Sequence, residues 1–178
     1  MANEVILGLG SNVGDRLSYL LQAITIIKEN NVILDKTSPI YESEAVLKDD
    51  APEEWNIPYL NMAISAKTKL TPEELLKLIK NIEQGIGRKY RGLWAPREID
   101  IDILAYGDMC INSNSLIIPH QHLCQRPFAL LPFADIKPNW RYPGKGLFRY
   151  KTIRYIANNV IIEPMPQKTG LECKIKQN

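Results

Sequence analysis

The sequence predicts a single α+β domain of ferredoxin-like βαββαβ order, an antiparallel sheet that carries two helices. Apolar runs with a period of two predict four strands, and two stretches with apolar residues at spacings of three and four predict the helices between them. The length of 178 residues suits one compact domain with its own core. The proline-rich last third predicts a C-terminal hairpin, short helices and irregular chain.

The first predicted strand covers residues 4–9 and stops at the turn Gly10-Ser11-Asn12. A helix should follow, because Asp15 can cap its first turn. Its buried stripe consists of five aliphatic residues at helical spacing: Leu17, Leu20, Leu21, Ile24 and Ile27. Asn30 and Asn31 are expected to end this helix.

Residues 32–41 and 59–68 predict the second and third strands. In the third strand, Tyr59 and Asn61 fall on the face opposite to Leu60. The connection over residues 43–56 is long and acidic, and we interpret it as a solvated loop.

Thr71 and Glu74 predict a capping box at the start of the second helix, with Pro72 at its first position. This helix should end near Gly85 or Gly87. Alternating apolar and polar residues then predict the fourth strand over residues 99–106.

Composition narrows the class of protein. A net charge of +2 gives no global field that would favour nucleic acid or an anionic membrane. Three scattered cysteines and the lack of an apolar leader predict a reduced, cytoplasmic, soluble protein without a membrane role. The domain is expected to cover residues 1–166, and the polar tail 167–178 is expected to be unstructured.

Asp100 and Asp102 are the first candidate site residues, because period two puts both carboxylates on one face of the fourth strand. With no histidine or cysteine beside them, they favour a hard cation such as Mg²⁺, which binds one or two carboxylates and leaves positions for water and phosphate oxygens. Taken alone, the pair could equally be an exposed strand face.

Residues 88–97 are basic and contain no acidic side chain. Cations and aromatic residues alternate in this segment: Arg88, Lys89, Tyr90, Arg91, Trp94 and Arg97. Arginine forks match phosphate oxygens, so the segment next to the two aspartates is typical of a polyanion site. Gly85, Gly87 and Gly92 predict that residues 85–95 move as a lid.

His120, His122 and Cys124 alternate in a manner that could indicate zinc. No fourth ligand lies at a suitable spacing, and Arg126 would repel a cation. We therefore favour a phosphate clamp made by His120 and Arg126, with His122 as a surface or structural histidine.

Further short motifs accompany these residues along the chain. They are Gly10-Ser11-Asn12, Tyr59-Leu60-Asn61, Ile82-Glu83 leading to Gly87-Arg88, the run from Trp94 through Pro96-Arg97 to Asp100-Ile101-Asp102, Pro119-His120, and Arg126-Pro127-Phe128. In combination they resemble the hydroxymethyldihydropterin pyrophosphokinase family over about residues 4–163.

The resemblance implies an enzyme of folate biosynthesis that transfers diphosphate from ATP to 6-hydroxymethyl-7,8-dihydropterin and releases AMP. Asp100 and Asp102 would hold two Mg²⁺ ions and, with Arg88 and Arg97, form the catalytic set. The residues implied to bind ATP are Arg88, Trp94, Arg97, Ile103, His120 and Arg126.

The pterin would stack between Phe128 and either Trp94 or a nearby lid residue, with the Asn61 amide hydrogen-bonded to its edge and Tyr59 beside it. The attacking hydroxyl would lose its proton to Asp102 or to water.

The chain departs from the family pattern at two positions. Tyr90 stands where a second lid arginine is common, so either Arg91 supplies that phosphate contact or the contact is absent, and we favour Arg91. Gln121 follows His120 where relatives have Tyr, which leaves the adenosine contact there in doubt. The acidic loop resembles versions fused to a dihydropteroate synthase, and the tail from residue 167 is interpreted as a linker remnant.

Two other functions fit parts of the pattern. Ferredoxin-like sheets with basic loops bind single-stranded RNA, although the predicted strands lack a cluster of exposed aromatic residues. A Mg²⁺-dependent nucleotidyltransferase could use the same aspartates, and it would release pyrophosphate instead of AMP.

Overall fold

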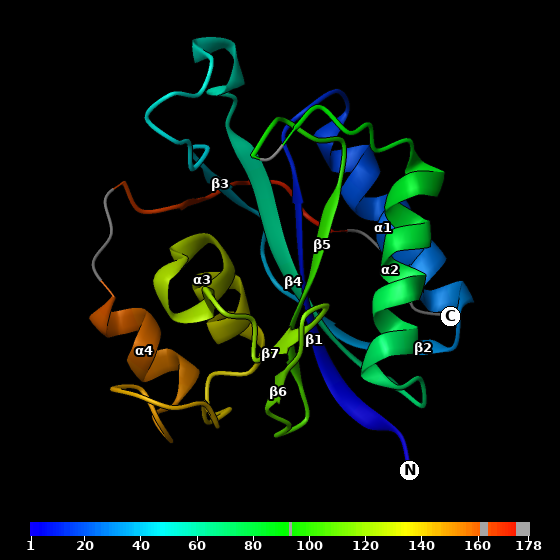
Figure 1. The fold of residues 1–178 in the computed structure, drawn as a ribbon, viewed down its shortest axis with the longest axis vertical. Helices are drawn as coiled ribbons and strands as arrows, with labels where there is room; N and C mark the ends of the chain where they lie inside the picture. The colour runs from blue at the N-terminus through cyan, green and yellow to red at the C-terminus, as the bar shows by residue number, and fades with distance from the viewer. Residues whose placement is uncertain (93, 161–163, 174–178) are drawn as a thin grey trace.

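The structure is a computed structural model that describes residues 1–92, 94–160 and 164–173. A six-stranded sheet crosses its centre (Figure 1). The strands are β1 (Asn3–Ser11), β2 (Val32–Thr37), β3 (Tyr41–Ser43), β4 (Tyr59–Thr68), β5 (Asp100–Tyr106) and β8 (Gln167–Lys168). Their order is β5-β1-β4-β3-β8, β2 also pairs with β4, and every pairing is antiparallel. The expected α+β class with an antiparallel sheet is confirmed.

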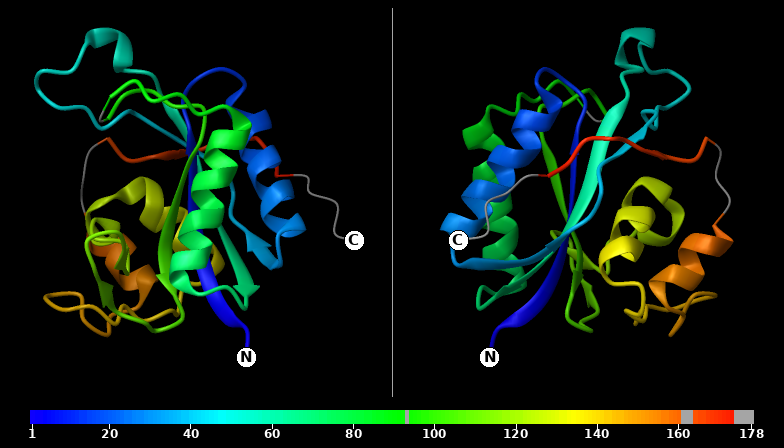
Figure 2. Two further views of the ribbon diagram at one scale, coloured as in Figure 1. Left: turned by 45° about the vertical axis from the view of Figure 1, so that its right-hand side comes forward. Right: turned by 180° about the vertical axis from the view of Figure 1, so that it is seen from behind.

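Helices cover both faces of the sheet (Figures 1 and 2). Helices α1 (Arg16–Glu29) and α2 (Pro72–Ile86) pack on one face, and α3 (Pro127–Ile136) and α4 (Ile153–Asn159) pack on the other. The alternation of β1 accounts for two cores: Val5 and Leu7 join the cluster under α1 and α2, whereas Ile6 joins the cluster under α3 and α4. The proline-rich last third thus supplies α3 and α4, the helical layer on the second face of the sheet.

Local signals hold both ends of α2. The Thr71 hydroxyl accepts a hydrogen bond from the Glu74 N–H, and the Glu74 carboxylate accepts one from the Thr71 N–H, so the predicted capping box is confirmed. Gly87 ends the helix in the left-handed conformation with φ 105°, which a side chain rarely adopts. The basic segment begins directly after this glycine.

Two sequence expectations about strands were wrong. The expected second strand divides into β2 and β3, because Pro39 has no N–H and Ser38 instead exchanges hydrogen bonds with Ala63. The tail is ordered up to residue 173: β8 pairs with β3, and the Thr169 N–H donates to the Ile40 carbonyl. Residues 174–178 lie outside the described part of the chain.

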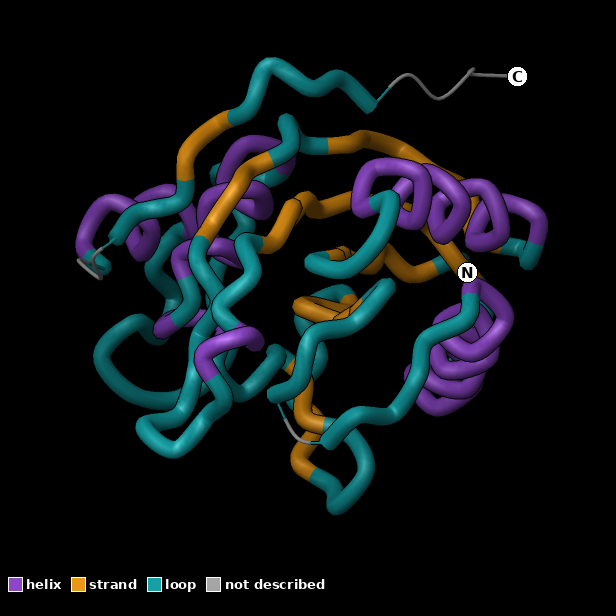
Figure 3. The backbone as a smooth tube through the Cα atoms, turned by 90° about the horizontal axis from the view of Figure 1, so that it is seen from above, coloured by secondary structure: helices purple, strands orange, loops and turns teal. Residues whose placement is uncertain are grey.

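The expected hairpin is present as β6 (Ile111–Asn112) and β7 (Ile117–Ile118), and short 3₁₀ turns occur at Glu53–Trp55 and Leu123–Gln125. Within the described residues, no helix has the length and apolar character to cross a membrane. The loops after β1, before β4 and before β5 gather at one end of the sheet, as the view from above shows (Figure 3). This end carries the candidate site.

Candidate active site

A cleft of about 400 Å³ opens at this end of the sheet. Its floor comes from β1, β4 and β5, and its walls come from α2, the basic segment before β5, and the start of α3. Ten of the eleven predicted site residues line it: Tyr59, Asn61, Arg88, Trp94, Arg97, Asp100, Asp102, His120, Arg126 and Phe128. Residues from six separate segments therefore converge, as the resemblance implied.

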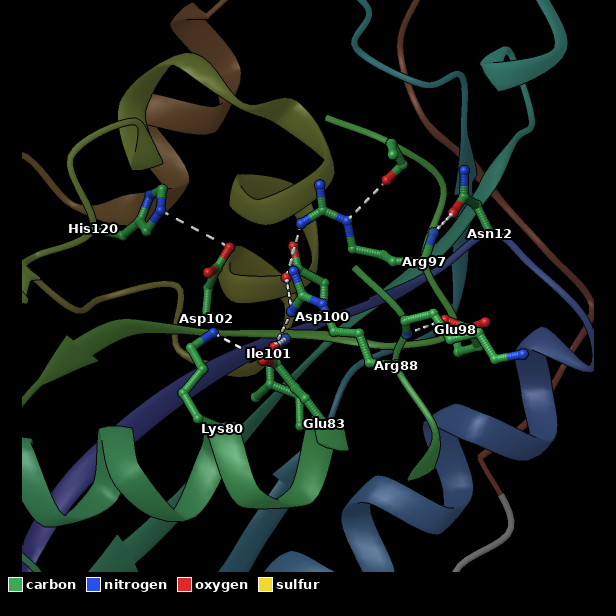
Figure 4. Close-up of polar contacts among 12 residues, drawn as sticks. Asn12, Lys80, Glu83, Arg88, Arg97, Glu98, Asp100, Ile101, Asp102 and His120 are labelled. Atoms are coloured by element: carbon green, nitrogen blue, oxygen red, sulfur yellow. Dashed lines mark hydrogen bonds and ion pairs between the residues drawn. The ribbon is translucent and has the colours of Figure 1, made fainter. Parts of the chain in front are cut away.

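Asp100 and Asp102 share one face of β5, as the strand period predicted (Figure 4). Ile101 and Ile103, on the opposite face, are buried in the core under α1 and α2. The Ile103 side chain lies in this core and does not line the cleft, so it gives no support to the expected contact between Ile103 and ATP, which stays a prediction.

Two arginines hold Asp100. Its Oδ1 lies 2.8 Å from Arg88 Nη1 and 3.1 Å from Arg97 Nη1. Burial alone would raise the pKa of Asp100, but Arg97 and Arg88, with help from Lys80, lower it below the ordinary value. Asp100 is thus ionised at neutral pH.

Asp102 has the opposite character. Burial and the neighbouring Asp100 charge raise its pKa to about 7, against the attraction of Arg126 and Lys80. Its Oδ2 lies 3.9 Å from His120 Nε2. Burial, followed by Arg126, lowers the pKa of His120 to about 4, so this imidazole is neutral at pH 7 and can donate a hydrogen bond without repelling a cation.

The donor set fits magnesium. No group of three or more histidine, cysteine, aspartate or glutamate side chains occurs among the described residues that could enclose a metal ion. Two carboxylates beside an open cleft suit Mg²⁺, which completes its octahedron with water and substrate phosphate oxygens. A dication would also remove the reason why Asp102 binds a proton, because it offsets the Asp100 charge.

Glu83 on α2 organises the back of the cleft, and composition and spacing gave it no role. Its side chain is 4% exposed, and its Oε1 lies 2.5 Å from Arg88 and 2.9 Å from the Ile101 N–H. Its Oε2 lies 2.9 Å from Lys80 Nζ. The carboxylate therefore ties α2 to β5 while it orients two cations. The available signal was its place on the apolar stripe of the helix, four residues after Ile79.

The basic segment is pinned at both ends. Arg91 makes a two-pronged ion pair with Glu98, at 2.5 and 3.1 Å, and Glu98 also accepts the Lys89 N–H. Asn12 accepts the Arg97 N–H through its side chain and donates its own N–H to the Arg97 carbonyl. In this conformation Arg91 does not line the cleft, which does not support a phosphate contact from this residue.

The amide of Asn61 is well placed on the floor. It is 5% exposed, and its Nδ2 donates to the Ser43 hydroxyl at 2.9 Å. Gly10 keeps the space beside it open, because a Cβ there would lie 3.1 Å from Asn61 Oδ1 and 3.5 Å from the Tyr59 ring. Burial raises the pKa of Tyr59, so its phenol stays protonated.

Trp94 and Phe128 both face Arg126. The guanidinium carbon lies 5.6 Å from the Trp94 ring centroid and 5.7 Å from the Phe128 centroid, within cation–π range of each. A flat ligand that stacks on Phe128 would replace the contact between Arg126 and Phe128 with a contact between two rings.

The acidic loop takes part in the site, which the sequence did not indicate. Glu44 and Val46 line the cleft, and Trp55 lies 3.6 Å from the Cβ position of Gly92 in the basic segment. His122 and Cys124 lie outside the cleft lining; His122 Nδ1 instead lies 3.3 Å from the Gln125 side chain.

Comparison with known proteins identifies similar sequences. The family model described as 7,8-dihydro-6-hydroxymethylpterin-pyrophosphokinase (HPPK) matches residues 6–138. A 2-amino-4-hydroxy-6-hydroxymethyldihydropteridine pyrophosphokinase from Aquifex aeolicus is 46% identical over 78% of this chain and 83% of its own length. A folate synthesis bifunctional protein from Chlamydia muridarum is 43% identical over 95% of this chain but only 38% of its own length.

Solved structures share the fold. A crystal structure of HPPK-DHPS in complex with substrates matches 88% of this chain and 43% of its own chain, with a TM-score of 0.64 and 17% identity. An HPPK-DHPS from Plasmodium falciparum with pterin and p-hydroxybenzoate gives a TM-score of 0.64 at 18% identity, over 89% of this chain and 43% of the other.

Proposed function

This chain belongs to the 7,8-dihydro-6-hydroxymethylpterin-pyrophosphokinase family, and we propose that its cleft carries out the diphosphate transfer of that family through Asp100, Asp102, Arg88 and Arg97. The enzyme transfers diphosphate from ATP to 6-hydroxymethyl-7,8-dihydropterin in folate synthesis. One observation carries the proposed site: the carboxylates, the arginines and the Asn61 amide line one continuous cleft.

The substrates divide the cleft between them. The triphosphate lies at the β5 side, where Arg88, Arg97 and Arg126 supply positive charge and His120 a neutral donor. The pterin lies at the β4 side, stacked on Phe128 with Trp94 or Tyr59 across from it, and its amide edge pairs with Asn61.

The reaction forms a bond between the hydroxymethyl oxygen and the β-phosphorus and breaks the bond from that phosphorus to the oxygen that leaves with AMP. Two Mg²⁺ ions, held by Asp100 and Asp102 and by the phosphates, would neutralise the charge on the triphosphate. The protein groups orient both substrates, which can lower the barrier by roughly 7 to 11 kcal/mol. Asp102, with a pKa raised to about 7 in the metal-free cleft, and water are the candidate proton acceptors.

The alternatives gain no support. RNA-binding sheets of this class expose one face for stacking, whereas α1 with α2 and α3 with α4 cover the two faces here. A nucleotidyltransferase would release pyrophosphate.

The nucleotide product tests the proposal. Incubation with ATP, Mg²⁺ and the reduced hydroxymethylpterin should yield AMP in step with the pterin diphosphate. ADP would indicate a single-phosphoryl kinase, and pyrophosphate a nucleotidyltransferase; either result would overturn the assignment.

We further propose that the chain works fused to, or associated with, a dihydropteroate synthase. Several relatives are folate synthesis bifunctional proteins, and this chain spans about two fifths of the length of the Chlamydia muridarum protein. The cytoplasm is the proposed site of action.

A further inference from the structure

We infer that Lys80 of α2 binds the triphosphate and supplies the cation that this chain lacks at Tyr90. The inference rests on the proposed function, because it takes ATP as the ligand. It adds a phosphate-binding residue that lies outside the basic segment, on a rigid helix.

The position of Lys80 gives the first argument. Of the residues of α2, Lys80 alone lines the cleft, and it also borders an adjoining cavity of about 280 Å³ beneath the basic segment. Figure 4 shows its side chain rising from α2 toward Asp102, on the side of the carboxylate pair opposite to Arg97. A phosphate bound at the aspartates would therefore meet cations from two sides.

The ammonium group is oriented but not neutralised. Its Nζ lies 2.9 Å from Glu83 Oε2, and the Lys80 side chain is 50% exposed. Glu83 is shared with Arg88, and Arg88 and Arg97 share Asp100. Lys80, Arg88 and Arg97 thus share two carboxylates between them. An ammonium carries three donors, so Lys80 can keep its bond to Glu83 and still donate to a phosphate oxygen.

The basic segment does not supply this charge in its described residues. Tyr90 is 87% exposed and has no cationic group. Arg91 forms a bidentate ion pair with Glu98 and does not line the cleft. Besides Arg88, Arg97 and Arg126, Lys80 is the one further cationic residue among the described residues that line the cleft, and it is held by α2, outside the basic segment.

The test compares ligand affinities of three variants with the parent. K80M removes the charge and keeps the aliphatic stem, K80R keeps the charge, and K77M changes an exposed lysine of α2 that does not line the cleft. The Kd values of a non-hydrolysable ATP analogue with Mg²⁺ and of the pterin are measured by titration calorimetry. Since a hydrogen bond to a charged group is lost at a half-exposed site, K80M should weaken the ATP analogue about tenfold.

In the same experiment the affinity for the pterin should not change, K80R should keep most of the affinity for the ATP analogue, and K77M should match the parent. Unchanged binding of the ATP analogue to K80M, or an equal loss for both ligands, would overturn the inference. If K80M does not fold, K80Q, which retains a donor for Glu83, takes its place with the same expected outcomes. A parent that binds the analogue and forms AMP keeps the proposed function even when the role of Lys80 fails.

Discussion

At the scale of single residues, the two aspartates of β5 have unlike surroundings although they are two positions apart. Asp100 forms ion pairs with Arg88 and Arg97, whereas Asp102 Oδ2 lies 3.9 Å from Nε2 of the neutral His120. At Asp100 the nearby cations outweigh the effect of burial, and the pKa is lowered. At Asp102 they do not, and the pKa is raised. The cleft keeps one carboxylate permanently charged and leaves the other to be charged when a cation arrives.

Asp→Asn substitutions at these positions test the metal assignment. Loss of one pre-organised charge contact in a closed site costs about 3 to 4 kcal/mol in the transition state, so each variant should turn over roughly 10²- to 10³-fold more slowly at limiting Mg²⁺. The affinity for pterin, which the proposed site assigns to Asn61 and Phe128, serves as the control. D100N should also lower stability, because it removes the negative charge that pairs with Arg88 and Arg97, whereas D102N should not. Near-parental turnover of a folded variant would exclude that aspartate as a metal ligand.

Acid should weaken the pair between Arg91 and Glu98. The hydrogen bond from Arg91 is the main cause that lowers the pKa of Glu98 from 4.5 to about 2. Because the folded-state pKa lies below the unfolded value, the stabilisation is complete above pH 4.5 and is lost as the pH falls through 2. E98Q should therefore lower the unfolding midpoint at pH 7, and the difference from the parent should shrink between pH 4.5 and 2.

D50N, which changes an exposed carboxylate of the acidic loop, provides the matched control. An E98Q midpoint equal to the parent value at pH 7 would show that the pair contributes nothing to stability.

The sequence predicted that Asp100 and Asp102 lie on the same face of their strand, because the alternation of side chains along a strand depends only on local spacing. Glu83 and Glu98 escaped prediction as functional groups, because each acts through partners distant in the sequence. A glutamate on a helix is usually solvated, and only the position of Glu83 on the apolar stripe sets it apart.

At the scale of elements, contacts at both ends of the basic segment leave a shorter stretch free to move than the positions of its glycines predict. Its start is tied by Lys89 and Arg91 to Glu98, and its end by Arg97 to Asn12. We therefore expect any motion of this segment to centre on Gly92, which has φ 116°, and Trp94, which is 37% exposed.

Trp94 fluorescence tests closure of this segment. In a variant that retains only Trp94, with phenylalanine in place of Trp55 and Trp140, addition of an ATP analogue and pterin should change the emission, because the indole exchanges water and Arg126 for ligand. The W94F protein, which keeps the other two tryptophans, reports any change that does not come from residue 94. A constant Trp94 signal with both ligands bound would count against closure.

The tail is the second element with a testable role. Besides the pairing of β8 with β3, Lys168 lies 3.1 Å from Asp135, which accepts the Tyr41 hydroxyl at 2.6 Å. A chain shortened to residues 1–166 would lose these contacts and expose the edge of β3, at a cost of about 1 to 2 kcal/mol. Urea unfolding measures this difference; an unchanged midpoint would support a domain that ends at residue 166.

Local signals predicted the elements whose ends they specify, such as α2 with its capping box. They did not predict β8, because two polar residues form a strand only when a distant edge offers its N–H and carbonyl groups. They also predicted one strand where the structure has β2 and β3, because Pro39 interrupts the hydrogen bonding to β4 without interrupting the apolar pattern of the sequence.

At the scale of the whole molecule, the site exists because three layers meet at one end of the sheet (Figures 1 and 3). The sheet provides the carboxylates and Asn61, and α2 provides Lys80 and Glu83. Helix α3 and the segment before it provide His120, Arg126 and Phe128. Periodicity predicted the sheet and its first helices. The second helical layer was not placed by the sequence, because its prolines obscure helical signals and its packing partner is a face of β1 and β4.

The most direct test of the whole account follows the phosphorus atoms of ATP. With ATP labelled at the β-phosphate, Mg²⁺ and 6-hydroxymethyl-7,8-dihydropterin, the account predicts that the label moves to the pterin in equal amount with the AMP formed. Label that stays on the nucleotide as ADP, or label that is released as pyrophosphate, would contradict a transfer of the β- and γ-phosphates to the pterin as one unit and would remove the basis for the proposed cleft chemistry.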